Sequence, residues 1–269
     1  MPFASVIAAT DLTALSAQVP GRARLLAQGP GARVVLTHVR PADRKRPPRA
    51  TAESKLAALG LTSGADELQF LIGDPAEELT ALALAAQAGL VVLGLHRKRR
   101  VLDLLRLTTM ERIVLAAPCP VLIAQLPPAR PYRQVLLATD FSPASAAALI
   151  AAATLAPEAE FHAIHALQVP LVGDAEAAMA SAEEARAEFL AMPGLPPLAE
   201  PPEIIPGGVH PVLQYRLDEL DADLLCLGAA SSEDGLGVYV RDLVRAPPTD
   251  VLVARAPVAT PVAAPLTGA

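Results

Sequence analysis

Short apolar runs that end on a glycine or a small polar residue recur along the whole chain. In one of them, 90–94, four apolar residues end on Gly94, and a second apolar run follows at 121–124. The segment between them has the pattern of a loop and a helix. Strand, loop, helix and strand in this order indicate half of a parallel α/β unit. The ligand of such a unit lies where the first strand ends, so the stretch after Gly94 is a candidate site.

The other apolar runs of the first 126 residues extend this pattern. Asp11 and Thr13 follow the run 5–9 and are residue types that end a strand and cap a helix. Alternating strands and helices predict a parallel sheet covered by helices. The predicted strands are 5–9, 33–39, 68–72, 90–94 and 121–124, and the predicted helices are 14–28, 50–59, 75–88 and 101–116. Pro20 disturbs the first turns of the helix 14–28.

The second half of the chain repeats the first. The run 135–142 matches 6–13 at an offset of 129 residues, and further landmarks recur in the same order. These landmarks are His38 and His165, Gly73 and Gly207, Leu79 and Leu213, and Gly94 and Gly228. Such a series indicates an internal duplication and two tandem α/β domains. The expected limits are a first domain 1–126, a stiff linker 127–132, a second domain 133–255 and a flexible tail 256–269.

Composition and charge exclude several classes of function. Hydrophobic residues make up 52% and charged residues 19% of the chain, which favours a buried core over disorder. Aromatic residues make up only 3% and the net charge is −6, so neither base stacking nor charge attracts nucleic acid. No apolar run reaches about 18 residues and no signal peptide is evident. We therefore expect a cytoplasmic protein without membrane association.

No group of side chains has the spacing of a catalytic or metal centre. Cys119 and Cys226 lie in or beside apolar strands and are expected to be small buried hydrophobes. His162 and His165 lie an odd number of positions apart and face opposite sides of a strand, which makes them a poor metal pair. No nucleophile elbow and no Walker-type lysine loop occur. The sequence therefore predicts no catalytic residue, no metal and no enzyme.

Given this repeat, each half resembles a universal stress protein domain of the UspA type. The motifs that carry the resemblance are Ala-Thr-Asp at 9–11 and 138–140, Thr-His-Val at 37–39, Ile-His-Ala at 164–166, Glu-Arg at 111–112 and Ala-Pro-Cys-Pro-Val-Leu at 117–122. The resemblance implies a five-stranded parallel sheet of order 3-2-1-4-5 in each half, flanked by helices. It also implies an intramolecular pseudo-dimer of the two halves. The short, apolar fifth strands, 121–124 and 251–255, are predicted to pair at this interface.

Members of this family that bind ATP carry the pattern G-x2-G-x9-G-S/T after the fourth strand, where small residues let backbone N–H groups approach the phosphates. In the first half this pattern falls on Gly94, Arg97, Leu107 and Thr108, so two of its three glycines are absent. Leu107 places apolar bulk where a phosphate would lie. The basic run 97–100 either attracts an anion or is a solvated loop.

In the second half the pattern begins at Gly228, has Ser231 at its second position and then loses register. The segment from Gly228 to Val251 is four residues shorter than its counterpart, and Gly237 keeps it open. Both halves keep the aspartate that the family uses to contact adenosine, although an aspartate there also fits a helix cap. The candidate ligand-binding residues are Asp11, Val39, Gly94, Arg97, Thr108, Asp140, Gly228, Ser231 and Gly237.

Three hypotheses of function follow. The first is a non-catalytic stress-response protein that binds ligands or protein partners and has degenerate nucleotide sites. The second is an ATP-binding protein, or a slow ATPase, that uses its second domain, with ATP as the candidate cofactor. The third is a scaffold that binds protein partners only. The missing glycines and Leu107 predict no ATP binding in the first half, and the four-residue deletion predicts weak or absent ATP binding in the second.

Overall fold

The computed structural model describes residues 3–27, 29–42, 49–58, 66–95, 107–169, 174–229 and 236–256. Its strands are β1 (Ser5–Ala9), β2 (Arg33–Arg40), β3 (Glu67–Ile72), β4 (Leu90–Gly94), β5 (Val121–Ala124), β6 (Gln134–Ala138), β7 (Glu160–Leu167), β8 (Glu203–Pro206), β9 (Leu224–Ala229) and β10 (Asp250–Arg255). Its helices are the 3-10 helix η1 (Ala14–Ser16) and α1 (Val19–Leu26), α2 (Arg49–Ala58), α3 (Pro75–Ala85), α4 (Thr109–Ala116), α5 (Pro143–Leu155), α6 (Ala175–Leu190), α7 (Val209–Leu220) and α8 (Val238–Arg245). None of these described helices is long and apolar enough to cross a membrane.

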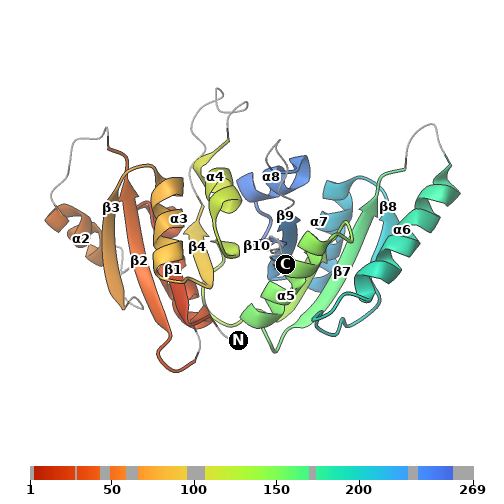
Figure 1. Cartoon of the computed structure of the whole chain (residues 1–269), viewed down its shortest axis with the longest axis horizontal. Coiled ribbons are helices and arrows are strands. Elements are labelled where there is room, and N and C mark those ends of the chain that lie inside the picture. Colours follow the sequence, from red (N-terminus) through yellow and green to blue (C-terminus); the bar gives the residue numbers. More distant parts are fainter. Residues whose placement is uncertain are drawn as a thin grey trace, which may run out of the picture.

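These strands form a single sheet in the order β3-β2-β1-β4-β5-β10-β9-β6-β7-β8. Read inward from each edge, the order is 3-2-1-4-5 twice, and the strands are parallel within each half. The predicted fold class and strand order are therefore confirmed. Figure 1 shows the first half in red to yellow-green and the second in green to blue, with α4 and α8 side by side where the halves meet.

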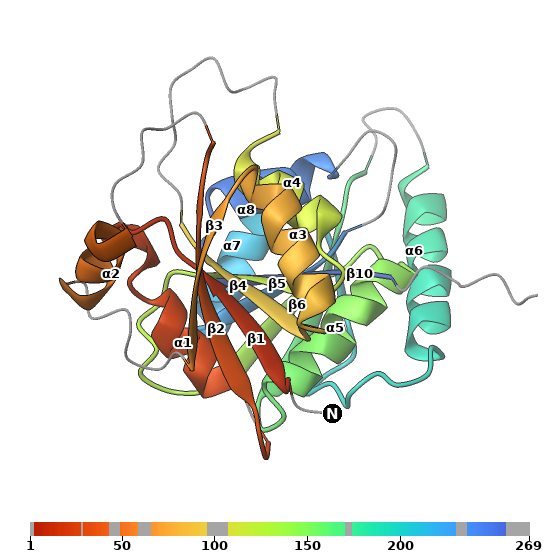
Figure 2. The ribbon, with the colours of Figure 1, turned by 60° about the vertical axis from the view of Figure 1, so that its left-hand side comes forward.

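Successive strand residues enter two hydrophobic cores, one on each face of the sheet. In β1, Val6 and Ala8 lie in the core with α1, whereas Ile7 lies in the core with α3. The first core also receives α2, α5 and α6, and the second receives α4, α7 and α8. Figure 2 shows α1 and α2 on one side of β1 to β3, and α3 and α4 on the other. Burial on both faces explains why the strands read as continuous apolar runs.

Two helices begin later than the sequence pattern predicted. The helix expected at 14–28 is instead the single turn η1, followed by α1 from Val19. Pro20 has no backbone N–H, so it is accepted in the first turn of α1 but not inside a longer helix. The helix expected at 101–116 is α4, which begins at Thr109 because Thr108 forms its N-cap. Residues 101–106 lie outside the described part of the chain.

The halves meet through β5 and β10, which pair antiparallel. The paired residues are Val121 with Val253, Leu122 with Leu252, and Ile123 with Val251. Residues 121–123 and 251–253 are equivalent in the repeat, so each contact recurs with the two halves exchanged. This is the pattern of a two-fold interface, with its axis between Leu122 and Leu252. The predicted pairing of the fifth strands is confirmed.

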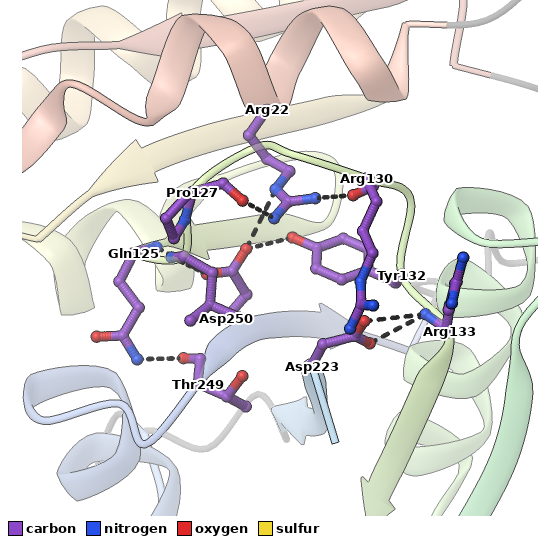
Figure 3. Close-up of polar contacts among 10 residues, drawn as sticks. Arg22, Gln125, Pro127, Arg130, Tyr132, Arg133, Asp223, Thr249 and Asp250 are labelled. Atoms are coloured by element: carbon purple, nitrogen blue, oxygen red, sulfur yellow. Dashed lines mark hydrogen bonds and ion pairs between the residues drawn. The ribbon is translucent and has the colours of Figure 1, made fainter. Parts of the chain in front are cut away.

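A buried polar cluster fixes the linker to this interface (Figure 3). Asp250 is fully buried, and its Oδ1 accepts hydrogen bonds from the N–H groups of Gln125 and Leu126 at 2.7 and 2.8 Å. Its Oδ2 accepts a bond from the Tyr132 hydroxyl at 2.5 Å and lies 3.3 Å from Nε of Arg22 in α1. Groups from the first half and the linker therefore neutralise a charge from the second half, as a buried charge requires.

Arg22 also holds the linker directly. Its guanidinium donates to the carbonyl oxygens of Arg130 at 3.0 Å and Pro127 at 3.3 Å, and lies 4.3 Å from the ring centre of Tyr132. Burial and the nearby charge of Asp250 raise the pKa of the Tyr132 hydroxyl well above its usual value, so the hydroxyl stays a donor. These contacts agree with a stiff linker, while the domain limits expected from the sequence stay a prediction.

One of the buried positions at which the two halves differ lies in the second strand, where Thr37 corresponds to Ile164. Thr37 is fully buried, and its hydroxyl has no hydrogen-bond partner. In contrast, the buried hydroxyl of Thr10 accepts a bond from the N–H of Leu12 at 3.0 Å and lies 2.7 Å from Oγ of Ser16. A buried polar group without a partner costs stability, whereas a bonded one contributes to it.

We expect Asp250→Ala to lower the free energy of unfolding by about 3–5 kcal/mol, because it leaves Arg22 buried without its ion-pair partner. Urea denaturation followed by circular dichroism measures this change. Asp223→Ala is the control. Asp223 is partly exposed and accepts bonds at 3.1 Å from the N–H groups of Arg133 and Gln134, so its loss should cost about 1 kcal/mol. Equal losses in the two variants would contradict the role given to Asp250.

We expect Thr37→Val to raise the free energy of unfolding by about 1 kcal/mol, because it removes an unpaired buried hydroxyl without changing the side-chain volume much. Thr10→Val, the matched control, should lower it by a similar amount, because Thr10 loses two hydrogen-bond contacts. Thermal unfolding of both variants compares them. A less stable Thr37→Val protein would show that the hydroxyl has a partner in solution.

Candidate functional site

The first strand of each half ends in the same hydrogen-bonded turn. Asp11 Oδ1 accepts bonds from the hydroxyls of Thr13 and Ser16 at 2.6 and 3.0 Å. Asp140 Oδ1 accepts a bond from the N–H two residues later at 3.0 Å and one from the hydroxyl of Ser145 at 2.7 Å. Both aspartates therefore hold the turn between strand and helix, which is one of the two roles that the sequence left open.

The residue after each aspartate has a left-handed backbone, with φ of 61° at Leu12 and 62° at Phe141. This conformation is unfavourable for a residue with a side chain, by about 1–3 kcal/mol. The N–H of each donates to a threonine hydroxyl two residues earlier, on Thr10 at 3.0 Å and on Thr139 at 2.8 Å. Strained backbone of this kind gathers at functional sites, so its presence in both halves supports a site at the strand ends.

A histidine of the second strand fixes each turn. His38 Nδ1 lies 2.8 Å from the carbonyl oxygen of Thr10, and His165 Nδ1 lies 2.7 Å from that of Thr139. Both contacts join the carboxyl ends of neighbouring parallel strands. The two histidines therefore position the turn that carries the aspartate.

Gly94 and Gly228 lie where the segment after the first strand crosses the end of the fourth. A Cβ on Gly94 would lie 2.7 Å from Cα of Ser16, and one on Gly228 would lie 2.4 Å from the backbone nitrogen of Ser145. These distances leave no room for a side chain. Close packing of the chain is therefore a second reason for glycine here, beside the approach of a phosphate that the resemblance implies.

In the second half, these elements surround a cavity of about 520 Å³ at the carboxyl ends of β6, β7 and β9. The cavity brings together three of the predicted site residues, Asp140, Gly228 and Gly237. Further lining residues are Ser145, Ile164, His165, Gln168, Leu213 and Tyr239. It lies beside the β6–β9 pair, where the strand order changes direction, and α/β sheets bind ligands at such a point.

Asp140 dominates the electrostatics of this cavity. Desolvation raises the pKa of its carboxyl group, but hydrogen bonds from Ser142 and Ser145 outweigh this effect and hold the pKa below its usual value. The group is therefore ionised at neutral pH. The bonds from the Ser142 N–H and the Ser145 hydroxyl both end on Oδ1.

Helix α8 begins at the cavity wall. Its N-cap, Gly237, has no side chain that accepts a bond from the first turn, and a Cβ there would meet nothing within 4 Å. Next to it, the hydroxyl of Tyr239 accepts a hydrogen bond from the side-chain amide of Gln168. The sequence analysis missed Gln168 and Tyr239, because neither belongs to a recognisable motif.

The corresponding helix of the first half, α4, begins differently. Thr108 and Glu111 form a capping box, in which the Thr108 hydroxyl accepts a bond from the Glu111 N–H at 3.3 Å and the Glu111 carboxylate accepts one from the Thr108 N–H. Glu111 is fully buried and lies 2.9 Å from Nε of Arg245 in α8. The predicted site residue Thr108 therefore caps its own helix, and side chains already occupy N–H groups of that helix start.

The remaining candidate residues are not among the described residues that line the cavity of the second half. Val39, at the end of β2, packs beside the second hydrophobic core, whereas Arg97, Ser231 and the basic run 97–100 lie outside the described residues.

Across the described ranges, no cluster of three or more acidic, histidine or cysteine side chains is arranged for a metal ion. Burial raises the pKa of the Cys119 thiol to about 12, so it is not a reactive thiolate at neutral pH.

We expect Gly228→Ala to lower the free energy of unfolding by about 1–3 kcal/mol, because its Cβ would overlap the backbone of α5. Gly237→Ser is the matched control, because it adds a side chain in open space and supplies an N-cap hydroxyl to α8. It should be neutral or slightly stabilising in the same urea denaturation. A tolerated Gly228→Ala would show that packing does not require this glycine.

Comparisons with known proteins agree with the fold described above. The sequence model of the Universal stress protein family matches residues 2–125. The sequence has no match among curated proteins. Among solved structures, a universal stress protein from Archaeoglobus fulgidus DSM 4304 is 18% identical with a TM-score of 0.65, and the match covers 94% of this chain and 96% of that one.

Two further solved structures cover both halves. A protein from Pseudomonas aeruginosa UCBPP-PA14 described as a universal stress protein is 21% identical with a TM-score of 0.61, covering 94% of this chain and 93% of that one. A protein of unknown function from Pseudomonas aeruginosa PAO1 is 22% identical with a TM-score of 0.59 and the same coverage. At such identities the likeness shows the fold. The first half of the chain therefore belongs to the universal stress protein family, and the second half repeats its fold in tandem.

Proposed function

We propose that the chain acts in the stress response by binding a small ligand in the cavity of its second half, without catalysing a reaction. The observation that carries this proposal is the position of the cavity at the carboxyl ends of β6, β7 and β9, beside the ionised Asp140. A volume of about 520 Å³ lies within the range of about 300–1,000 Å³ that small-molecule sites have.

The polar groups of the cavity favour binding over catalysis. A nucleophilic serine needs a base within hydrogen-bond reach. The hydroxyl of Ser145 instead donates to Asp140, whose lowered pKa makes it a weak base. The nearby His165 is bonded to the carbonyl of Thr139. These described contacts hold the strand-end turn and supply no activated nucleophile.

The runner-up is an ATP-binding protein, or a slow ATPase, that uses the second half. It is favoured by the uncapped start of α8 at Gly237, since such N–H groups suit a phosphate. The first half supports this function less, because the capping box of Thr108 and Glu111 occupies donors at the matching helix start. The third possibility, a scaffold that binds protein partners only, has no single observation in its favour.

Mass spectrometry of the native protein tests the proposal. We expect a small molecule to co-purify with the intact chain. Asp140→Ala should abolish its retention, because it removes the acceptor in the cavity, whereas Asp11→Ala, the equivalent change in the first half, should keep it. Thermal unfolding should confirm that both variants fold. Loss of the ligand only in Asp11→Ala, or steady turnover of ATP by the wild type, would contradict the proposal.

A further inference from the structure

A second cavity lies between the two halves, on the face of the sheet that α5 covers. Its volume is about 970 Å³, and its wall combines the start of β1, the turns before β4 and β5, one side of α5 and the end of β10. We call it the inter-half groove. Helix α5 contributes six residues to it, which are Pro143, Ala146, Ala147, Ile150, Ala151 and Thr154. Among them, the isoleucine is 37% exposed, although residues of this type are usually buried.

The repeat gives this groove a counterpart beside α1. Ser16 and Ser145 form equivalent hydrogen bonds with the strand-end aspartates, so the offset of 129 residues extends from the first strand of each half into the helix that follows. At this offset Gly21 of α1 corresponds to Ile150 of α5. Because a two-fold axis relates the halves, the surface of α1 around Gly21 is equivalent to the surface of α5 in the groove.

The linker covers this counterpart (Figure 3). A Cβ on Gly21 would lie 2.7 Å from Cγ of Pro128. Beside it, Arg22 donates to the carbonyl oxygens of Pro127 and Arg130. The chain that leaves β5 therefore packs directly on the first helix of its own half.

The chain that leaves β10 repeats the sequence of the linker. Strands β5 and β10 are equivalent at an offset of 130 residues, from 121 to 251, and three linker residues recur at this offset beyond β10. The pairs are Pro127 and Pro257, Ala129 and Ala259, and Pro131 and Pro261. Ala256 lines the groove, and residues 257–269 lie outside the described part of the chain. The duplication in the sequence therefore extends past the last strand by the length of the linker.

We propose that residues 257–262 of the tail bind in the inter-half groove against α5, as the linker binds against α1. The chemistry of the two surfaces agrees. The segment reads Pro-Val-Ala-Thr-Pro-Val and carries no charge. Its prolines have no N–H and favour an extended backbone, so the segment brings few donors without a partner into an apolar groove. This inference does not depend on the ligand cavity of the second half.

In the groove, apolar groups replace the polar anchors of the linker. The pairs are Arg22 and Ala151, Tyr132 and Phe3, and Asp250 and Pro120. The second member of each pair lines the groove. Binding of the tail therefore depends on the burial of apolar surface, including the exposed side chain of Ile150, rather than on an ion pair.

Disulfide cross-linking of the full chain tests this contact. Val258 corresponds to Pro128, which lies against α1, so we expect Val258→Cys to form a disulfide with Ile150→Cys on mild oxidation. The matched control pairs Val258→Cys with Leu190→Cys, since Leu190 in α6 is exposed and is not part of the groove wall. Both pairs carry Cys119→Ala, which removes a thiol from the groove. Because binding raises the local concentration of the two thiols, the groove pair should cross-link at least about fivefold faster.

A nitroxide label at Val258→Cys gives an independent measurement, because a disulfide can trap a rare contact. The label should broaden the methyl NMR signal of Ile150 and leave that of Leu190 sharp. Ala147→Asp, in the same full-length chain, puts a carboxylate in the groove wall. It should restore the Ile150 signal, since the uncharged tail cannot compensate a buried charge.

Equal cross-linking of the two cysteine pairs, or an Ile150 signal that the label leaves sharp, would overturn the proposal. A disulfide that joins two chains would also overturn it, because the groove would then bind the tail of a second copy. A cross-linking rate that does not change with protein concentration would support binding of the tail to its own chain.

Discussion

The antiparallel pairing of β5 with β10 is the contact on which the rest of the structure depends. It joins two five-stranded halves into one sheet, so each hydrophobic core continues across both halves. A short edge strand of four residues provides little stability alone, but here it is central in a ten-stranded sheet. The buried cluster around Asp250 and the Glu111–Arg245 ion pair then fix the two halves in one orientation.

Local sequence patterns predicted much of this fold, because each strand is a continuous apolar run and the repeat confirmed the assignments in the second half. The apolar pattern placed the starts of α1 and α4 wrongly. It does not show that a proline excludes a longer helix, or that a threonine forms the N-cap. Contacts such as Tyr132 with Asp250 join residues 118 positions apart. No local pattern encodes such a pair, so the interface cluster was not predictable.

The candidate site, too, could be predicted only in part from the sequence. Its aspartates and glycines were predictable from the motifs, but their roles required coordinates. Asp140 holds a turn with one oxygen and faces a cavity, and Gly228 permits close packing of α5. The duplication has kept the turn in both halves, with Leu12 and Phe141 in the same backbone conformation, while the helix starts at Thr108 and Gly237 have diverged. The two halves therefore share one fold and one strand-end turn, but the starts of α4 and α8 beside that turn differ chemically.

The two central strands differ in sequence, and one of the differences has a consequence for assembly. By backbone shape alone, β10 would pair equally well with the β10 of another chain, because the register is self-complementary. Asp250 has no acidic counterpart in the first half, where Pro120 takes its place. Two β10 strands in contact would bury two carboxylates away from Arg22 and Tyr132, at a cost of several kcal/mol for each. One aspartate thus selects the unlike pairing and disfavours association of newly made chains through like strands.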